Sequence, residues 1–294
     1  MADLLIVGGG FAGVWAAMSA TRVADAAGCE LDILLVSTGP DLVIKPRLYE
    51  ADPSRMRVPL DSVLRPLGVR RTMAEVTGMS VADQRVDLVR ADGGIGQEPF
   101  GRLVLATGSG VRRPLVAGAS LVHDVDTIES AEALDRHLSG LPDTYGPGRF
   151  TAVVVGSGFT GIEVACELVD RLRRVAQAPA EVRVCLIELA DRLVPQLGDG
   201  PRPTISAALA ELDVEVRLGV AVTAVGPDTV DLSDGSTIEA RTVVWTAGIA
   251  AGPLTAKVGG RLDPVGRLHV DRYLRVPQAP TVFTAGDVAR GRHR

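Results

Sequence analysis

The sequence predicts an α/β protein built from two related halves. In each half an apolar run leads into the pattern G-x-G-x-x-G, at residues 8–13 and 156–161. A helical pattern follows each motif, and a second apolar run follows each helix, at 31–36 and 182–187. A strand, a glycine-rich turn, a helix and a second parallel strand form the unit that binds dinucleotides. We therefore predict two doubly wound, Rossmann-like dinucleotide-binding domains.

The repeat continues beyond the glycine motifs. Each half contains an alternating apolar segment broken by an Asp-Gly turn signal, at 86–93 and 230–235, which predicts a three-stranded β-meander. A last buried strand then ends at a small, glycine-containing turn, formed by Ala106, Thr107 and Gly108 in the first half and by Ala247 and Gly248 in the second. One glycine motif would be weak evidence, because such turns also let a helix pack closely on a strand. Two motifs with matching downstream elements are strong evidence.

The three glycines of each motif have separate physical roles. The first permits a tight turn, the second lets the backbone approach a pyrophosphate, and the third lets the helix pack against the strand. The positive N-terminus of the helix then holds the phosphate charge. The predicted phosphate-binding residues are Gly8, Gly10, Phe11, Ala12 and Gly13 in the first half, and Gly156, Gly158, Phe159, Thr160 and Gly161 in the second.

The composition of the 294-residue chain excludes several other classes of protein. Its net charge of −5 disfavours a nucleic-acid partner, whose phosphates require a basic surface. The apolar runs are far shorter than the roughly 18 to 20 residues of a membrane-spanning helix, and no basic leader precedes the first strand. We therefore expect a cytoplasmic protein. The 3 cysteines and 4 histidines are widely scattered, so we expect neither a disulfide framework nor a bound metal.

An apolar strand pattern at 279–284 runs into Gly286 and Asp287. This segment resembles the flavin-binding signature of the two-dinucleotide-domain flavoprotein reductases. The resemblance implies that Asp287 accepts hydrogen bonds from the flavin ribitol, and that the next helix directs its N-terminus at the isoalloxazine. An ordinary strand and helix cap is the alternative, since Asp is a good N-cap residue. We predict an FAD-binding domain at 1–113 and 250–294, with an NAD(H)-binding domain at 114–249 inserted in it.

Three further segments, at 45–50, 156–163 and 245–248, resemble those of type II NADH dehydrogenases, and the resemblance covers most of the chain. These enzymes belong to the superfamily of FAD-dependent pyridine nucleotide-disulfide oxidoreductases. Its disulfide reductases carry a C-x-x-x-x-C pair soon after the first glycine motif, and this sequence has none. The resemblance implies that NADH reduces bound FAD and that the electrons then pass to an acceptor, for which the family favours a quinone.

Two other functions stay open. A reductase of a small iron–sulfur protein shares the same two folds, and a module that binds NADH and FAD without turnover is the third hypothesis. The resemblance implies a longer C-terminal region, which in the family supplies the quinone pocket, dimer contacts and an amphipathic membrane anchor, whereas only 288–294 follow Asp287 here. Because members of the family carry such an anchor, peripheral contact with the cytoplasmic face of the membrane is the alternative to a location in the cytoplasm. The sequence specifies no oligomeric state.

The residue that ends the second strand of each half predicts how the ribose is bound. Glu188 ends that strand in the second half, where a carboxylate accepts ribose hydroxyls of NADH and repels the 2′-phosphate of NADPH. The nearest arginine, Arg192, is expected to pair with Asp191 or solvent, so NADPH is the second choice. The matching residue of the first half is Ser37, whose uncharged hydroxyl predicts weaker flavin binding. The resemblance places the adenine of FAD near the backbone of Val76.

Glu163 and Lys45 are the candidate catalytic residues. The resemblance places Glu163 beside the flavin and nicotinamide, where a carboxylate orients the ring or manages a proton; a surface helix glutamate is the alternative. Lys45 and Arg47 lie in a loop that the family turns towards the flavin, where positive charge stabilises the reduced, anionic flavin. A solvated pair of loop residues is the alternative. The basic run at 171–174 is expected to be an exposed helix face.

Overall fold

The computed structural model describes residues 1–112, 114–176 and 181–291 of the chain, which falls into two compact units. The sequence placed the domain boundaries at 113 and 250 and left residues 44–56 in the first domain. In the structure this short segment groups with the second unit, because Lys45 and the backbone of Tyr49 bond to side chains there. Unit 1 consists of Met1–Val43, Arg57–Gly110 and Ile249–Arg294, and unit 2 of Ile44–Met56 and Val111–Gly248.

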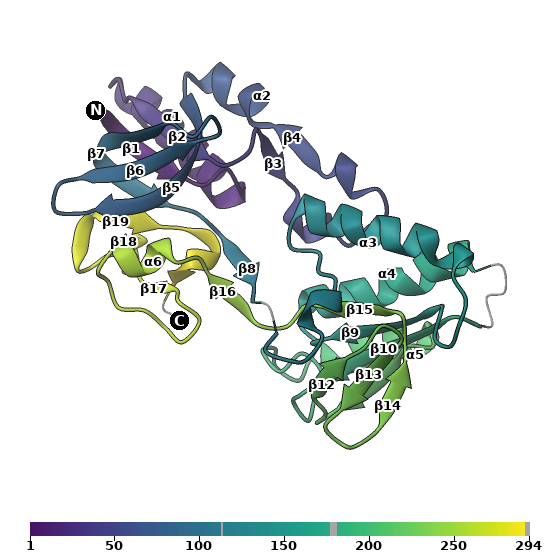
Figure 1. Ribbon diagram of the computed structural model, residues 1–294. Helices are drawn as coiled ribbons and strands as arrows, with labels where there is room; N and C mark the ends of the chain where they lie inside the picture. The colour runs from purple at the N-terminus through teal and green to yellow at the C-terminus, as the bar shows by residue number, and fades with distance from the viewer. Residues whose placement is uncertain (113, 177–180, 292–294) are drawn as a thin grey trace. The chain divides into compact units, whose positions relative to one another are not determined.

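A parallel sheet forms the centre of unit 1. Its strands lie side by side in the order β5, β2, β1, β7 and β19 (Figure 1). β5 and β7 are long, and part of each leaves this sheet to pair with β6 in an antiparallel meander. The strands are β1 (Ala2–Val7), β2 (Ile33–Ser37), β5 (Arg70–Ser80), β6 (Arg85–Arg90), β7 (Ile95–Leu105) and β19 (Ala279–Thr284).

Alternate side chains of β1 face opposite sides of this sheet, as the period of a strand requires. Ile6 packs with Val14 and Ala17 of helix α1 (Phe11–Ala27), whereas Leu5 and Val7 pack with the meander. The sheet of unit 1 is therefore buried on both faces, which explains its near-continuous apolar runs. The smaller elements of this unit are β3 (Asp41–Val43), β4 (Arg57–Pro59), α2 (Leu60–Leu64), η3 (Arg65–Leu67), β8 (Ser109–Val111, whose last residue belongs to unit 2), β16 (Ile249–Ala251), α6 (Leu254–Lys257), β17 (Leu268–His269), β18 (Arg275–Val276), η7 (Gly286–Val288) and β20 (Ala289–Arg290).

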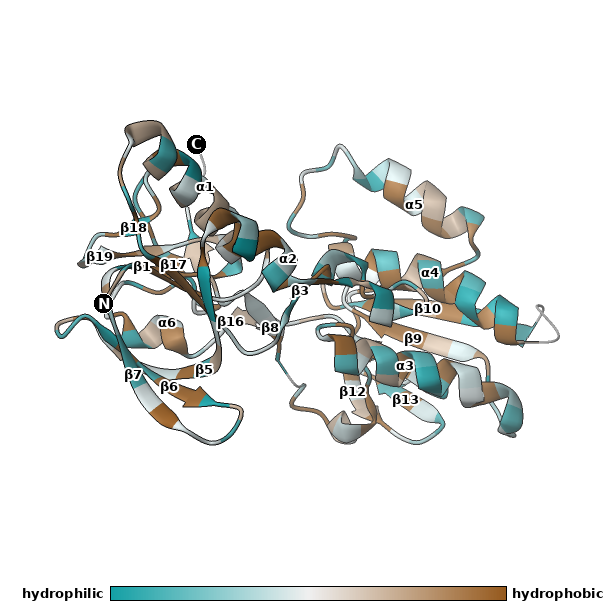
Figure 2. Cartoon of the chain, turned by 90° about the horizontal axis from the view of Figure 1, so that it is seen from above, coloured by the Kyte–Doolittle hydropathy of each residue, from teal (hydrophilic) through white to brown (hydrophobic). Residues whose placement is uncertain are grey.

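Unit 2 repeats the plan with a parallel sheet in the order β11, β10, β9 and β15. Val153 and Ile187 of this sheet pack against Val230 and Ile238 of a separate antiparallel meander. Helices α3 and α4 show teal and brown segments along their length in Figure 2, as expected for helices with one buried face. The elements are η1 (Lys45–Arg47), η2 (Pro53–Arg55), η4 (Ala119–Leu121), α3 (Ile128–Gly140), η5 (Leu141–Asp143), β9 (Thr151–Val155), α4 (Phe159–Val175), β10 (Arg183–Glu188), α5 (Arg202–Glu211), β11 (Glu215–Leu218), β12 (Val222–Val225), β13 (Thr229–Leu232), β14 (Thr237–Glu239) and β15 (Thr242–Trp245).

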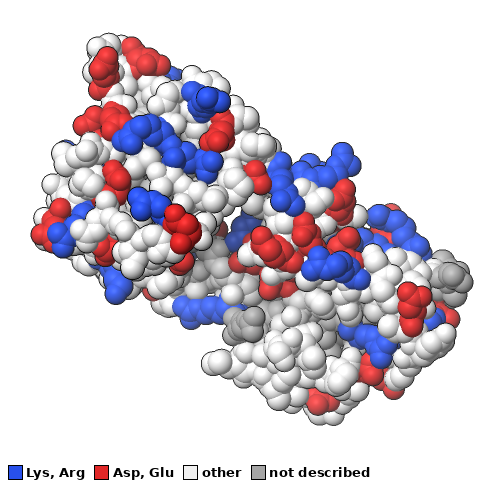
Figure 3. Space-filling view, turned by 45° about the horizontal axis from the view of Figure 1, so that its top comes forward, with Lys and Arg blue, Asp and Glu red and all other residues white. Residues whose placement is uncertain are grey.

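The predicted fold class is confirmed: each unit is an α/β layer structure with a glycine motif between a parallel strand and a long helix, β1 and α1 in unit 1 and β9 and α4 in unit 2. In the described part of the chain, each helix is too short or too polar to cross a bilayer. Acidic and basic side chains are interspersed on the face shown in Figure 3. This view contains no continuous basic surface of the kind that nucleic-acid binding requires.

Candidate functional site

The glycine loop of unit 1 lies between β1 and α1. Gly8 has a φ of 118°, and a Cβ atom there would lie 2.2 Å from the carbonyl oxygen of Ala106. A Cβ on Gly13 would lie 1.9 Å from the carbonyl oxygen of Gly8. No atom lies within 4 Å of the Cβ position of Gly10. The first and third glycines are therefore required by the protein's own packing, whereas the second borders open space.

Unit 2 forms the same loop between β9 and α4. Gly156 has a φ of 100°, and an added Cβ would lie 3.0 Å from the Cβ of Ala247. A Cβ on Gly161 would lie 1.8 Å from the carbonyl oxygen of Gly156 and 2.8 Å from the hydroxyl of Thr246. Gly158 again borders open space. In both loops, therefore, the first and third glycines avoid steric clashes and the second borders open space.

Both helices begin without a side-chain cap. α1 starts at Phe11 after Gly10, and α4 starts at Phe159 after Gly158; neither N-cap glycine offers a side chain that could accept from the first N–H groups of its helix. The first backbone N–H groups of each helix are therefore left for an external acceptor, and the helix dipole favours an anion there. Open space beside an uncapped helix start fits a pyrophosphate. We call the glycine loop and the helix start of each unit its cradle. The residues of both cradles are thus suited to hold a dinucleotide.

The hydrogen bonds of the two loops identify equivalent positions at the ends of β2 and β10. The amide of Gly8 donates to the carbonyl of Val36 at 2.8 Å, and the amide of Gly156 donates to the carbonyl of Ile187 at 2.8 Å. The next residues, Ser37 and Glu188, therefore occupy matching positions, as counting along the sequence predicted. Ser37 is 6% exposed, and its hydroxyl donates to the carbonyl of Gly39 at 2.8 Å.

Hydrogen bonds from the glycine loop and from the residues after β10 hold the Glu188 carboxylate. Its Oε2 accepts from the amide of Ser157 at 2.8 Å and from the Ser157 hydroxyl at 2.7 Å, while Oε1 accepts from the amide of Ala190 at 2.8 Å. Partial burial acts to raise the pKa of this carboxyl, but the hydrogen bonds outweigh it and hold the pKa below its usual value. Glu188 is therefore ionised at neutral pH. Arg192 lies 3.6 Å from Asp191, which confirms the expected pairing.

The C-terminal strand of unit 1 ends beside its glycine loop. The amide of Ala285 donates to the carbonyl of Leu105 at 3.1 Å, and a Cβ added to Gly286 would lie 2.9 Å from the Cβ of Ala12. The hydroxyl of Ser109 donates to Oδ2 of Asp287 at 2.7 Å. Unit 1 therefore gathers the predicted residues Gly8, Gly10, Phe11, Ala12, Gly13, Ala106, Thr107, Gly108, Gly286 and Asp287 at the carboxyl ends of β1, β7 and β19.

Val76 lies apart from this group. It sits in the antiparallel part of β5, opposite Leu88 of β6, and its side chain is 7% exposed within the core of unit 1. The last residue of β5 that pairs with β2 is Met73, opposite Ser37. Any contact that Val76 makes with a ligand must therefore come from its backbone, as the sequence reading specified.

The loop that carries Lys45 and Arg47 is well anchored in unit 2. Nζ of Lys45 lies 2.7 Å from Oδ1 of Asp126. Arg47 donates twice to the carboxylate of Glu50, at 2.5 and 2.6 Å. Each positive charge thus has an acidic partner, but the Arg47 side chain is 55% exposed and pairs within its own loop, which fits the alternative of a solvated loop residue. Such pairing fixes where the charge lies but reduces the net positive potential around it.

Glu163 lies on the exposed part of α4, and partial burial raises the pKa of its carboxyl. Burial and the Glu163 charge together raise the pKa of the Tyr49 hydroxyl and of the Cys166 thiol. These three groups therefore form one acidic neighbourhood within unit 2. Because its pKa is raised, Cys166 stays a thiol at neutral pH, which disfavours a role as a nucleophile.

The basic run at 171–174 is not uniformly exposed, so that expectation was wrong for half of it. Arg171 is 6% exposed and Leu172 0% exposed. The Arg171 guanidinium donates to Oδ1 of Asp135 on α3 at 2.7 Å and to the carbonyl of Tyr49 at 3.1 Å. A buried guanidinium needs such partners, and α3 and the segment Ile44–Met56 supply them. Arg171 therefore fastens that segment to unit 2.

Sequence reasoning missed the side chains that brace the loop of unit 2. Ser157 is buried and bonds to Glu188. The Thr246 hydroxyl lies within hydrogen-bond distance of two carbonyl oxygens, that of Val155 at 2.9 Å and that of Gly156 at 3.2 Å. The available signal was the difference between the halves, since Gly9 and Ala106 stand at the matching positions of unit 1. A polar residue inside an otherwise apolar repeat marks a possible hydrogen-bonding role.

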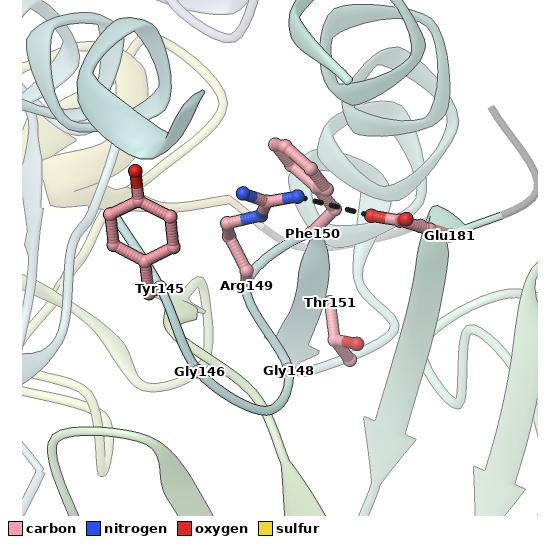
Figure 4. Close-up of a pocket in the computed structure, with 7 residues that line it drawn as sticks. All are labelled: Tyr145, Gly146, Gly148, Arg149, Phe150, Thr151 and Glu181. Carbon is pink, nitrogen blue, oxygen red and sulfur yellow. Dashed lines mark hydrogen bonds and ion pairs between the residues drawn. The ribbon is translucent and has the colours of Figure 1, made fainter. Parts of the chain in front are cut away.

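A cavity of about 450 Å³ lies at the amino end of β9 (Figure 4). Arg149 lies between Tyr145 and Glu181 there, 3.2 Å from the Glu181 carboxylate and with its guanidinium carbon 4.4 Å from the centre of the Phe150 ring. The glycine loop follows the opposite end of this five-residue strand, about 16 Å away at ~3.3 Å per residue. The cavity is therefore separate from the nucleotide cradle.

The fold and the paired cradles define a protein that binds two dinucleotides. Residues 2–294 match the model of the pyridine nucleotide-disulphide oxidoreductase family, and the chain belongs to that family.

The chain is 42% identical to an NADH dehydrogenase-like protein of Mycobacterium tuberculosis (strain CDC 1551 / Oshkosh), over 99% of this chain and 74% of that protein. It is 29% identical to a type II NADH:quinone oxidoreductase of Mycobacterium tuberculosis (strain ATCC 25618 / H37Rv), over 97% of this chain and 66% of that protein. The structure of NDH2 from Plasmodium falciparum in complex with NADH aligns with a TM-score of 0.83 at 16% identity, over 99% of this chain and 65% of that one. The last similarity concerns the fold alone.

Proposed function

We propose that this protein is an FAD-dependent NADH oxidoreductase in which unit 1 holds FAD and unit 2 holds NADH. The observation that carries the proposal is the pair of uncapped glycine cradles, one in each unit, built on the same backbone hydrogen bonds. The names of the two mycobacterial relatives support the same activity.

Side chains outside the cradles support the assignment of the two ligands. Unit 1 has a Gly-Asp pair, Gly286 and Asp287, beside the first turn of α1, and this aspartate would accept hydrogen bonds from the ribitol of FAD. Unit 2 has an acid at the end of β10, Glu188, whose ionised carboxylate would accept a ribose hydroxyl of NADH and repel a 2′-phosphate. The chain thus presents an anionic selector in one unit and a neutral serine in the other.

When bound, FAD supplies the redox chemistry by taking a hydride from NADH and passing electrons to an acceptor, for which we propose a quinone. The protein's own groups hold the ligands and manage charge and protons. Burial raises the pKa of the Glu163 carboxyl above its usual value, which makes it a better proton acceptor than an ordinary surface glutamate. Lys45, fixed by Asp126, and Arg47, fixed by Glu50, place their charges at set positions along the loop of unit 2.

Anaerobic titration tests this proposal. We expect the purified protein, supplied with FAD, to be yellow, to lose its visible flavin band on addition of NADH, and to regain it on addition of menadione. A protein that stays colourless with excess FAD would refute the assignment of unit 1. Recovery of the band with ferredoxin but not menadione would replace the quinone by an iron–sulfur protein. Slow recovery with air alone would favour a nucleotide-binding module.

A further inference from the structure

Ser157 connects three parts of unit 2 from a fully buried position. It is 0% exposed, and both its amide and its hydroxyl donate to Oε2 of Glu188, at 2.8 and 2.7 Å. The hydroxyl oxygen also accepts from the amide of Val194 at 3.1 Å. One side chain therefore joins the glycine loop, the end of β10 and the loop that follows Glu188.

The loop after Glu188 is held in an unfavourable conformation at Val194. This β-branched residue is 0% exposed and has a φ of 44°, in the left-handed region that such side chains avoid. A strained residue persists only when its surroundings fix it. Ser157 supplies one attachment, and Arg202 supplies another by donating to the carbonyls of Leu193 at 2.9 Å and Leu197 at 2.8 Å.

The same network does not exist at the matching positions of unit 1. Gly9 replaces Ser157, and an added Cβ there would lie 2.8 Å from Leu60 and 3.0 Å from the Cβ of Ser37. Ser37 replaces Glu188 and donates to the carbonyl of Gly39. Since unit 1 forms its glycine loop without these contacts, the fold does not require them. The network in unit 2 therefore serves the ligand of that unit.

We propose that Ser157 is a positioning residue that sets the selectivity of unit 2 for NADH over NADPH, an inference that rests on the proposed function. Ser157 bonds one oxygen of the Glu188 carboxylate and the Ala190 amide bonds the other, so both oxygens are fixed in the orientation in which a ribose hydroxyl would meet them. Fixed in this way, the carboxylate cannot turn away from a 2′-phosphate.

Ser157→Ala tests the proposal in the FAD-loaded protein. We expect the KM for NADH to rise on the order of tenfold with kcat nearly unchanged, because the lost hydroxyl bonds a charged group that contacts the ligand. The ratio of NADH to NADPH selectivity should fall by a similar factor. Calorimetric binding of NAD⁺ and NADP⁺ should show the same change without turnover. Ser157→Gly, which reproduces the residue of unit 1, should behave alike.

Two further comparisons separate this role from a general structural one. Ser233→Ala removes a serine that accepts from the Ala221 amide in the meander, and it should leave the selectivity ratio unchanged. In a Glu188→Ala background, Ser157→Ala should have no additional effect on the ratio, since its action passes through Glu188. An effect of equal size in both backgrounds overturns the proposal.

The outcomes also distinguish this inference from the proposed function. If NADH reduces the flavin of the unchanged protein but neither Ser157 variant alters the selectivity ratio, the inference fails and the function stands. If NADH does not reduce the flavin, the function fails, and calorimetry with NAD⁺ still reports on Ser157. Should both Ser157 variants fail to fold, Arg202→Met loosens the same loop from its other attachment, and an unchanged ratio in that variant overturns the proposal.

Discussion

Units 1 and 2 build the same turn around Gly8 and Gly156 but surround it with different side chains. In both, the amide of the first glycine donates to the second strand, and a Cβ added to the third glycine would lie less than 2 Å from the carbonyl oxygen of the first. At the end of the second strand, unit 1 has Ser37 and unit 2 has Glu188. We therefore expect the shared backbone to set where a pyrophosphate binds and the side chain at the strand end to set which ribose is accepted.

The units also close the loop differently. In unit 2 the Thr246 hydroxyl bonds to the carbonyls of Val155 and Gly156, whereas unit 1 has Ala106 at this position and brings Gly286 against Ala12 instead. A polar side chain braces one loop, and an additional strand end braces the other. Unit 1 thereby places an acid, Asp287, next to its cradle without placing one at the strand end.

Alanine substitution at the third glycine should produce the largest effect and should separate the units. A Cβ on Gly161 would lie 1.8 Å from the Gly156 carbonyl oxygen, so Gly161→Ala should destabilise unit 2 by about 3 kcal/mol or more. NADH binding should be lost while FAD remains bound. Gly13→Ala should do the reverse. Thermal unfolding and flavin content measure both effects.

Gly158→Ala is the matched control, because no atom lies within 4 Å of its Cβ position. This variant should unfold at nearly the same temperature as the unchanged protein, but it should weaken NADH binding by intruding on the pyrophosphate. If it bound NADH normally, the open space beside α4 would not be the phosphate site, and the parallel between the cradles would fail.

Removal of the strand-end acid should have the next largest effect. Glu188→Ala should lower the preference for NADH over NADPH on the order of tenfold or more, since it removes both the acceptor and the repulsive charge. Bound FAD should be unchanged, and its loss would show that the two units had been assigned the wrong way round. Because the pKa of Glu188 is lowered, the preference should persist to a lower pH than an ordinary glutamate would allow and should decline as the carboxyl becomes protonated.

A smaller effect is expected from Arg171, which ties the segment Ile44–Met56 to unit 2. Arg171→Met should destabilise unit 2 by about 2 kcal/mol. This is less than the loss expected on breaking a fully buried ion pair, because the Asp135 side chain is 40% exposed. Proteolysis within this segment should become faster. Arg174→Met, on the exposed side of the same helix, should change stability by less than about 0.5 kcal/mol. Equal effects of the two changes would contradict the anchoring role.

The sequence predicted the features that depend on local pattern. Apolar periodicity and glycine spacing were enough to place β1, β9, α1 and α4 and to match Ser37 with Glu188. The buried state of Arg171 could not be predicted, because its partners lie 36 and 122 positions away along the chain. The role of Ser157 was hidden for the same reason: its partner Val194 is 37 residues distant. Tertiary contacts of polar groups leave no periodic signal in the sequence.

Acid should weaken unit 2 through a histidine pair that unit 1 lacks among the described residues. The rings of His123 and His137 are 4.4 Å apart, and burial together with the neighbouring His123 lowers the pKa of His137 to about 4. Because the unfolded chain binds this proton near pH 6.5 and the folded one only near pH 4, stability falls as pH drops through that window. Allowing for partial exposure, we expect a loss on the order of 2 kcal/mol.

Hydrogen exchange measured at pH 7 and pH 5 checks this difference. Exchange in α3 and β15, which flank the pair, should accelerate more at pH 5 than exchange in α1 and β1, after correction for intrinsic rates. His137→Gln keeps a hydrogen-bonding group for the Thr242 hydroxyl, which lies 2.9 Å from the imidazole, but removes the titration of His137. It should reduce the extra acid sensitivity and leave the part that comes from His123, whose pKa burial also lowers. If both units were equally sensitive to acid and this substitution changed nothing, the histidine pair would not be the cause of the acid response.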